Sequence, residues 1–163
     1  MEEWLEGQVV KNIKWTKNLA SLKIKAKINN HQAGQFTRIG LKVNDDFITR
    51  SYSYASAPKD EMLEIIYVNI PNGKLSPILH KLEIGDKVSV MQQAIGYFTL
   101  DEIPDGENLW MLATGTALGV FLAILKTSIP WKRFKKVILI HSVRYAEELI
   151  YQDLIAEMKQ RYP

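Results

Sequence analysis

The segment Arg50–Ser53, with the sequence Arg-Ser-Tyr-Ser, places a guanidinium, an aromatic ring and two hydroxyls on consecutive residues. An arginine offers a planar fork for phosphate oxygens, and an aromatic ring beside hydroxyls suits a flat heteroaromatic ring with a polar edge. Further along, Gly73–Pro77 contains a turn glycine and then a helix start, for which we predict Ser76 as the N-cap and Pro77 as the first helical residue. Amides at a helix start suit a phosphate. Together the two segments predict a site for a pyrophosphate-linked flavin.

A third segment, Thr114-Gly115-Thr116, lies between an apolar run and an apolar helix. The turn between a strand and a helix is where an α/β sheet binds nucleotide phosphate. The segment lacks a full GxGxxG pattern, because position 113 is Ala and only Gly115 and Gly119 are present. Taken alone, this segment therefore does not match the glycine pattern that identifies a dinucleotide-binding site.

The elements that must position these segments begin with β-structure. Apolar and polar residues alternate along 22–28 and 37–43, which is typical of strands with one wet face. Asn44-Asp45-Asp46 reads as a turn, and Ser76–Leu82 reads as a short helix. Further strands are expected at 47–54, 63–70 and 87–92. Many short strands with turns between them indicate a sandwich or barrel.

The pattern changes near Pro104-Asp105-Gly106. Leu109–Ala113 and Val137–Ile140 are continuous apolar runs, which predict two strands buried on both faces. The first run leads into an apolar helix that ends near Lys126, and a second helix is expected over 145–162. This is a βαβα unit of a parallel sheet. Two parallel strands are too few for a stable doubly wound sheet.

Three segments resemble the bacterial ferredoxin (flavodoxin)–NADP(H) reductases: residues 50–58 (RSYSYASAP), 72–77 (NGKLSP) and 113–119 (ATGTALG). The similarity extends along essentially the whole chain, and the motifs occur in the family's order and spacing. The resemblance implies an antiparallel Greek-key β-barrel FAD domain, expected at 1–101, and the N-terminal part of an α/β NADP-binding domain, expected at 102–163. Because that family continues with more strands and a C-terminal aromatic that covers the flavin, we expect the chain to be a truncated form.

The resemblance also implies roles for individual residues. Tyr52 would stack on the isoalloxazine ring and Ser53 would bond near flavin N5, so these two are the expected catalytic residues. Each of the proposed site residues could instead have only a structural role, as an ordinary residue of a strand, a turn or the surface. The expected cofactor-binding residues, of which Arg144 would contact NADP(H) and the others FAD, are Arg50, Ser51, Tyr52, Ser53, Ile66, Tyr67, Val68, Asn69, Lys74, Leu75, Ser76, Thr116 and Arg144.

Composition limits the other classes. The 163 residues are 47% hydrophobic and 24% charged, as in soluble globular proteins, and no apolar run reaches transmembrane length. There are no cysteines and three scattered histidines, so we expect no metal site. The sequence is consistent with a cytoplasmic protein. The net charge is +3, but no nucleic-acid-binding motif accompanies it. We therefore expect neither a nucleic acid nor a membrane as a partner.

The expected activity is reversible electron transfer between NADPH and ferredoxin or flavodoxin. Two basic clusters could steer such an acidic carrier, although solvated faces are the favoured interpretation: Lys23, Lys25 and Lys27, and then Lys132, Arg133, Lys135 and Lys136. Two alternatives stay open, which are the reductase component of an oxygenase and a non-catalytic flavin-binding module. We also expect residues after Pro104 to self-associate or to be loosely ordered.

Overall fold

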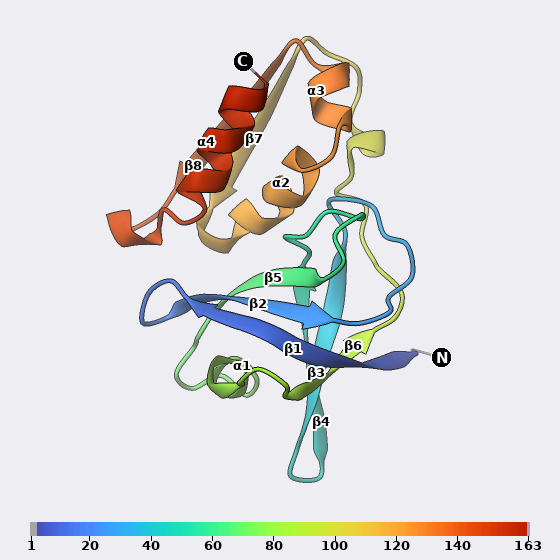
Figure 1. The fold of residues 1–163 in the computed structure, drawn as a ribbon, viewed down its shortest axis with the longest axis vertical. Helices are drawn as coiled ribbons and strands as arrows, with labels where there is room; N and C mark the ends of the chain where they lie inside the picture. The colour runs from blue at the N-terminus through green and yellow to red at the C-terminus, as the bar shows by residue number, and fades with distance from the viewer. Residues whose placement is uncertain (1–2, 163) are drawn as a thin grey trace.

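The computed structural model describes residues 3–162, which form two lobes (Figure 1). The first lobe is a six-stranded antiparallel sheet with the order β4-β3-β6-β1-β2-β5. Its edges meet, because Tyr54 and Ile65 form a bridge and the Ala55 amide donates to Glu64 O at 2.7 Å. This curled sheet confirms the predicted barrel fold class. Its strands are β1 (Trp4–Lys14), β2 (Leu19–Lys25), β3 (Phe36–Val43), β4 (Asp46–Ser53), β5 (Leu63–Val68) and β6 (Lys87–Met91).

The barrel core comes from the inward residues of these strands. Leu22, Ile24, Ile39, Ile65 and Val90 are all fully buried, as the alternation along the strands requires. The predicted turn after β3 is confirmed, with Asn44 at a φ of 56°. No range was predicted for β1, which pairs with both β2 and β6 and carries an irregular register between Val9 and Lys11.

The short helix is α1 (Ser76–Lys81), and the prediction that Ser76 caps it is wrong. Leu75 occupies the N-cap position without any side-chain hydrogen bond. The Ser76 hydroxyl instead accepts a hydrogen bond from the Ile70 amide at 3.0 Å. The hydroxyl therefore stabilises the preceding turn rather than the helix start.

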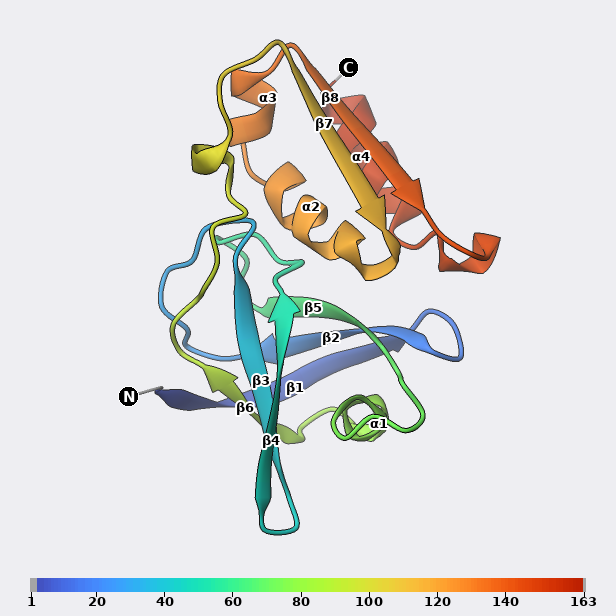
Figure 2. The same ribbon diagram turned by 180° about the vertical axis from the view of Figure 1, so that it is seen from behind.

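The second lobe is a two-stranded parallel sheet with helices on one face (Figure 2). The strands run in register, with Leu109 opposite Val137 and Ala113 opposite His141. The predicted order of strand, helix, strand and helix is present, and a third helix, α3, was not predicted. The elements are β7 (Asn108–Thr114), α2 (Leu118–Leu125), α3 (Ile129–Arg133), β8 (Lys136–Ser142) and α4 (Gln152–Arg161), with 3₁₀ turns at Leu100–Glu102, Gly115–Ala117 and Ala146–Glu148.

The prediction that both strands are buried on both faces is wrong. Leu109, Met111 and Ala113 are buried, whereas Trp110 and Leu112 are 61% and 66% exposed. In β8, Ile140 is 45% exposed. In Figure 2 the two strands lie in front of α4 and no element covers their outer face. The apolar run therefore reflects one covered face and one apolar face that is open within the described residues.

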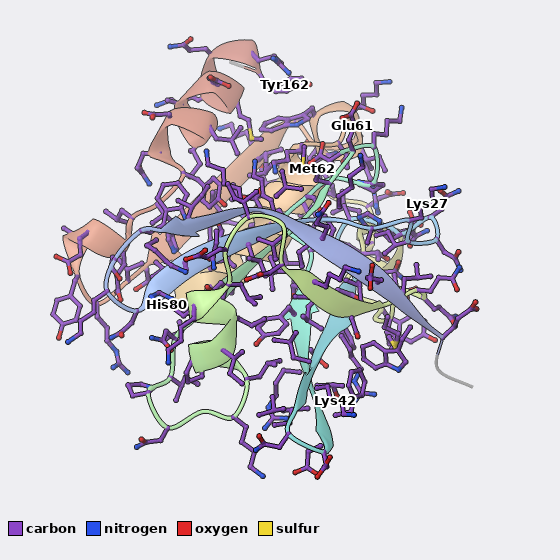
Figure 3. All side chains as sticks on the ribbon, turned by 60° about the horizontal axis from the view of Figure 1, so that its bottom comes forward. Lys27, Lys42, Glu61, Met62, His80 and Tyr162 are labelled. Carbon is purple, nitrogen blue, oxygen red and sulfur yellow. The ribbon has the colours of Figure 1, made fainter. Side chains whose placement is uncertain are left out.

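The single helix predicted over 145–162 is also wrong. A 3₁₀ turn comes first, and α4 begins only at Gln152, because Tyr151 has a φ of 60°. That left-handed conformation breaks the helix. Beyond α4 the ring of Tyr162, labelled in Figure 3, stacks on Trp131 with ring centroids 4.2 Å apart.

Helix α2 joins the lobes. All of its residues are buried, and a Cβ on Gly119 would lie 3.3 Å from Cδ1 of Ile66 in β5. The helix therefore approaches the barrel so closely that a Cβ at this position would require Ile66 to shift by a few tenths of an ångström. Arg133, in α3, also ties the lobe to the preceding connection, because it pairs with Asp105 at 3.1 Å and donates to Leu100 O and Ile103 O. The predicted boundary at residues 101 and 102 stays a prediction.

Candidate functional site

A groove of about 440 Å³ opens on the barrel where β4, β5 and the turn before α1 come together. The 3₁₀ turn after β7 contributes one residue, so both lobes meet here. The groove collects most of the predicted site residues from four separate segments. Its lining residues are Arg50, Ser51, Tyr52, Ile66, Tyr67, Val68, Ile70, Gly73, Lys74, Leu75, Ser76 and Thr116.

The charge of the groove is entirely positive. Arg50 and Lys74 are exposed, and no carboxylate lies among the lining residues. One guanidinium nitrogen of Arg50, Nη1, donates to the Thr49 carbonyl oxygen at 2.7 Å. The other guanidinium nitrogens make no hydrogen bond within residues 3–162 and are free for a ligand. The groove therefore suits an anionic ligand that carries several oxygens.

Two tyrosines, Tyr52 and Tyr67, are among the residues that line the groove. Tyr52 is half-buried, and burial raises the pKa of its hydroxyl while the Arg50 charge lowers it. Tyr67 is buried, and its hydroxyl donates to Asn12 Oδ1 at 3.0 Å. Burial raises the pKa of Tyr67 to about 12, against a smaller lowering by the Asn12 hydrogen bond. Tyr67 packs in the barrel core and is 2% exposed, so of these two rings it is that of Tyr52 that suits contact with a flat ring system.

The turn before α1 holds its shape through the residues of the predicted motif. The Gly73 amide donates to Ile70 O at 2.8 Å. A Cβ on Gly73 would lie 2.9 Å from Ser76 Oγ and 3.0 Å from Ile70 O, so a larger residue would displace the turn. Within residues 3–162 the backbone amides of Lys74, Leu75 and Ser76 donate no hydrogen bond. All three residues line the groove, so we expect these amides to add donors for a ligand bound there.

Thr116 brings the second lobe to the groove. Gly115 before it has a φ of +52°, which strains any other residue, and His141 Nε2 lies 3.1 Å from Gly115 O. This contact links the ends of β7 and β8. The carboxyl edge of the parallel sheet, the edge at which such sheets bind nucleotides, therefore lies next to the groove.

Three predicted site residues are not in the groove walls. Ser53 is exposed at the end of β4, and Arg144 is exposed in the loop after β8. Asn69 is half-buried, and its Oδ1 is buried without a hydrogen-bond partner among the described residues. Their roles stay predictions.

Two lining residues, Ile70 and Gly73, were not among the predicted site residues, although the Asn-Gly turn signal covers Gly73. Sequence reasoning also missed Asn12. Its amide nitrogen donates to Leu79 O and Leu82 O, both at 2.9 Å, and thereby fixes the end of α1 to β1. A polar residue on a strand carries no signal for such a contact.

The described part of the chain lacks two other features, a cluster of metal-binding side chains and a helix able to span a membrane. Residues 3–162 contain no group of three or more histidine, aspartate or glutamate side chains that could hold a metal ion. No helix in the same range has the length and hydropathy needed to cross a membrane.

Residues 6–98 match the family of oxidoreductase FAD-binding domains. The chain belongs to this family. Residues 111–163 match the oxidoreductase NAD-binding domain. The second match covers the lobe that contains β7, α2 and β8. The two matches occur in the order that the resemblance to the bacterial reductases implies.

Relatives of known name share this resemblance. The flavodoxin/ferredoxin–NADP reductase of Shigella flexneri is 46% identical, and that of Escherichia coli K12 is 45% identical, each over 162 residues that cover 99% of this chain and 65% of the relative. A ferredoxin NADP⁺ reductase of Neisseria gonorrhoeae, solved with bound FAD and NADP, has a TM-score of 0.91 and 33% identity over 99% of this chain and 66% of its own. The resemblance to the bacterial ferredoxin (flavodoxin)–NADP(H) reductases is therefore confirmed. The chain spans about 65% of the length of the curated relatives it matches.

Proposed function

We propose that this chain binds FAD non-covalently in the groove between β4, β5 and the turn before α1. The observation that carries the proposal is the composition of the groove. Arg50, Lys74 and three free amides present donors for a diphosphate, with no carboxylate to oppose it. Tyr52 lies beside them as a neutral aromatic face. The residues present therefore fit a dinucleotide that joins a flat ring to a diphosphate.

Within this site each residue has its own task. Arg50 and Lys74 would hold the diphosphate, while Tyr52 would cover one face of the ring system. Ser53 would offer a hydroxyl at the N5 edge of the ring, and Thr116 would close the groove from the second lobe. Bound FAD supplies an acceptor that takes a hydride and releases single electrons. The residues named above would orient that group in the groove.

The wider activity is a separate proposal, because the chain spans about 65% of the length of the curated relatives it matches. We propose electron transfer between NADPH and ferredoxin or flavodoxin, supported by the names of the similar reductases. Arg144, exposed after β8, would contact NADP(H). The alternative of a flavin-binding module without catalysis shares the same groove. NADPH oxidation in the presence of FAD and a carrier separates the two.

An acidic carrier would find fewer free cations than the sequence predicted. Lys135 pairs with Glu107, and Arg133 is held by Asp105 and by backbone carbonyls, whereas Lys132 and Lys136 of the same cluster are exposed and make no ion pair within the described residues. Lys25 and Lys27 are exposed and make no ion pair within the described residues. We therefore propose that this end of β2 contributes to steering an acidic carrier.

We also propose that two copies of this chain associate through the outer face of β7 and β8. Trp110, Leu112 and Ile140 give that face a continuous apolar character. Exposed apolar strands recruit another chain when nothing covers them. The predicted cytoplasmic location stays a prediction.

Reconstitution tests the flavin site. The purified chain is incubated with FAD and separated from free FAD by gel filtration. The protein peak should carry flavin absorbance, and that absorbance should leave with the small molecules after denaturation. A protein peak without flavin would contradict the proposal, and flavin that stays with the denatured chain would contradict non-covalent binding.

A further inference from the structure

A buried carboxylate lies at the junction between the two lobes. Glu64, on β5, is 3% exposed, and its backbone amide donates to Ser56 Oγ at 3.0 Å. Its Oε1 accepts a hydrogen bond from the Tyr151 hydroxyl at 2.6 Å. Its Oε2 lies 3.8 Å from the ammonium nitrogen of Lys126, and Lys23 lies 3.9 Å from Oε1. The groove that holds the proposed flavin does not include this group.

The main partners of Glu64 come from the other lobe. Lys126 is the C-cap of α2, and Tyr151 is the N-cap of α4. The Lys126 ammonium also donates to Ala55 O at 2.8 Å and lies 3.7 Å from Asp60 Oδ2. Each of these contacts joins a helix end of the α/β lobe to the barrel. They form a polar junction whose members are Glu64, Lys126 and Tyr151.

Tyr151 is held in this junction against its backbone preference. Its φ of 60° is unfavourable for an aromatic residue, so tertiary contacts must outweigh the strain. Besides the Glu64 bond, its ring packs against Trp15 with centroids 4.8 Å apart, and Trp15 Nε1 donates to Ser21 Oγ at 3.2 Å. The break between the 3₁₀ turn and α4 is therefore created by contacts with the barrel.

The polar junction restricts the relative orientation of the two lobes, which the apolar contact between them does not fix. Gly119 and Ile66 pack closely, but apolar surfaces allow sliding and rotation. Hydrogen bonds and ion pairs require particular distances and angles. A buried carboxylate that lost Tyr151 and Lys126 would be left poorly compensated, so rotation of the lobe away from this arrangement is penalised.

We propose that Glu64 is an interlobe positioning residue, whose bonds to Tyr151 and Lys126 fix the rotation of the α/β lobe on the barrel. Thr116 and the carboxyl edge of β7 and β8 then stay at the groove. The consequence for flavin rests on the proposed function.

The test uses the absence of cysteine in this chain. Cysteines that carry spin labels are introduced as Lys42→Cys on the barrel and Lys159→Cys on α4, because both lysines are exposed. Lys42 lies far from the α4 end marked by Tyr162 in Figure 3. Pulsed electron–electron double resonance on the chain without added FAD should give one narrow distance distribution. Tyr151→Phe and Glu64→Gln should each lose that narrow peak, whereas the control Tyr145→Phe should keep it.

Two further readouts separate a positioning role from general destabilisation. Circular dichroism must show that each variant is folded, and Tyr151→Phe keeps the test open if Glu64→Gln does not fold. After FAD is added, the visible circular dichroism of the flavin should change in Tyr151→Phe and not in Tyr145→Phe. A folded Tyr151→Phe chain with an unchanged distance distribution overturns the inference.

The two proposals fail in different ways. If the parent chain binds no FAD but the distance distribution broadens in Tyr151→Phe, the flavin site is wrong and the interlobe role stands. If FAD binds and Tyr151→Phe changes neither the distribution nor the flavin signal, the positioning role is wrong and the flavin site stands.

Discussion

Gly119 of α2 lies against Ile66 of β5, and a Cβ at Gly119 would be 3.3 Å from Ile66 Cδ1 and 3.4 Å from Ala55 Cβ. The same strand that lines the proposed flavin groove therefore supports the helix of the other lobe. A change at this contact affects both the packing of the lobes and the placement of Thr116.

Gly119→Val should destabilise the chain by about 1–3 kcal/mol, because the added methyl groups overpack the contact between α2 and β5. The free energy of unfolding in urea measures this loss. Gly106→Ala is the matched control, since a Cβ there would meet nothing within 4 Å. Equal stability of Gly119→Val and the parent would show that the lobes are not tightly packed at this point.

Arg50→Ala should weaken FAD binding by about 1.5–3 kcal/mol, because a charge-assisted contact to the diphosphate is lost. The dissociation constant from a fluorescence titration reports the change. Lys42→Ala, which removes an exposed cation outside the groove, controls for the loss of net charge. If both variants bind FAD equally, Arg50 does not contact the ligand.

The ionisation of Tyr67 should make the fold sensitive to alkali. Its pKa is raised from 10.0 to about 12, so the folded state holds the hydroxyl proton more tightly than the unfolded state. The resulting stabilisation, about 2–3 kcal/mol, is complete below pH 10 and is lost as the pH rises from about 10 to 12. Urea unfolding across this pH range should show a smaller loss in Tyr67→Phe than in the parent. If Tyr67→Phe and the parent showed the same pH dependence, Tyr67 would not contribute to the alkaline loss of stability.

The outer face of β7 and β8 should drive self-association. Trp110→Ser combined with Leu112→Ser removes two exposed apolar side chains without touching the covered face. Light scattering should then give a lower mass at high concentration than the parent chain gives. Leu149→Ser, which removes another exposed leucine of the same lobe, should leave the parent's mass unchanged. A parent that stays monomeric at every concentration would contradict this proposal.

Local patterns predicted most of the fold. The alternation of apolar and polar residues marked β2 and β3, and turn signals marked the bend at Asn44, because both depend on neighbouring residues. The motif around Arg50 and the motif around Lys74 were predicted to share a site, and both line the same groove.

The features that were predicted wrongly depend on tertiary structure, which local sequence patterns do not reveal. Tyr151 interrupts a helical pattern because Glu64 and Trp15 hold it, and neither partner is near it in sequence. Trp110 looks like a core residue in an apolar run, yet no described element covers it. Ser76 is of a residue type that commonly caps helices, but its hydroxyl instead accepts a hydrogen bond from the Ile70 amide.

The central claim is that the groove recognises both the ring and the diphosphate of FAD. Isothermal titration of the unmodified chain with FAD and, separately, with riboflavin tests it most directly, since riboflavin has the ring without the diphosphate. We predict one FAD per chain with a dissociation constant in the micromolar range or below, and clearly weaker binding of riboflavin. Equal affinity for the two, or no saturable binding of FAD, would contradict the account.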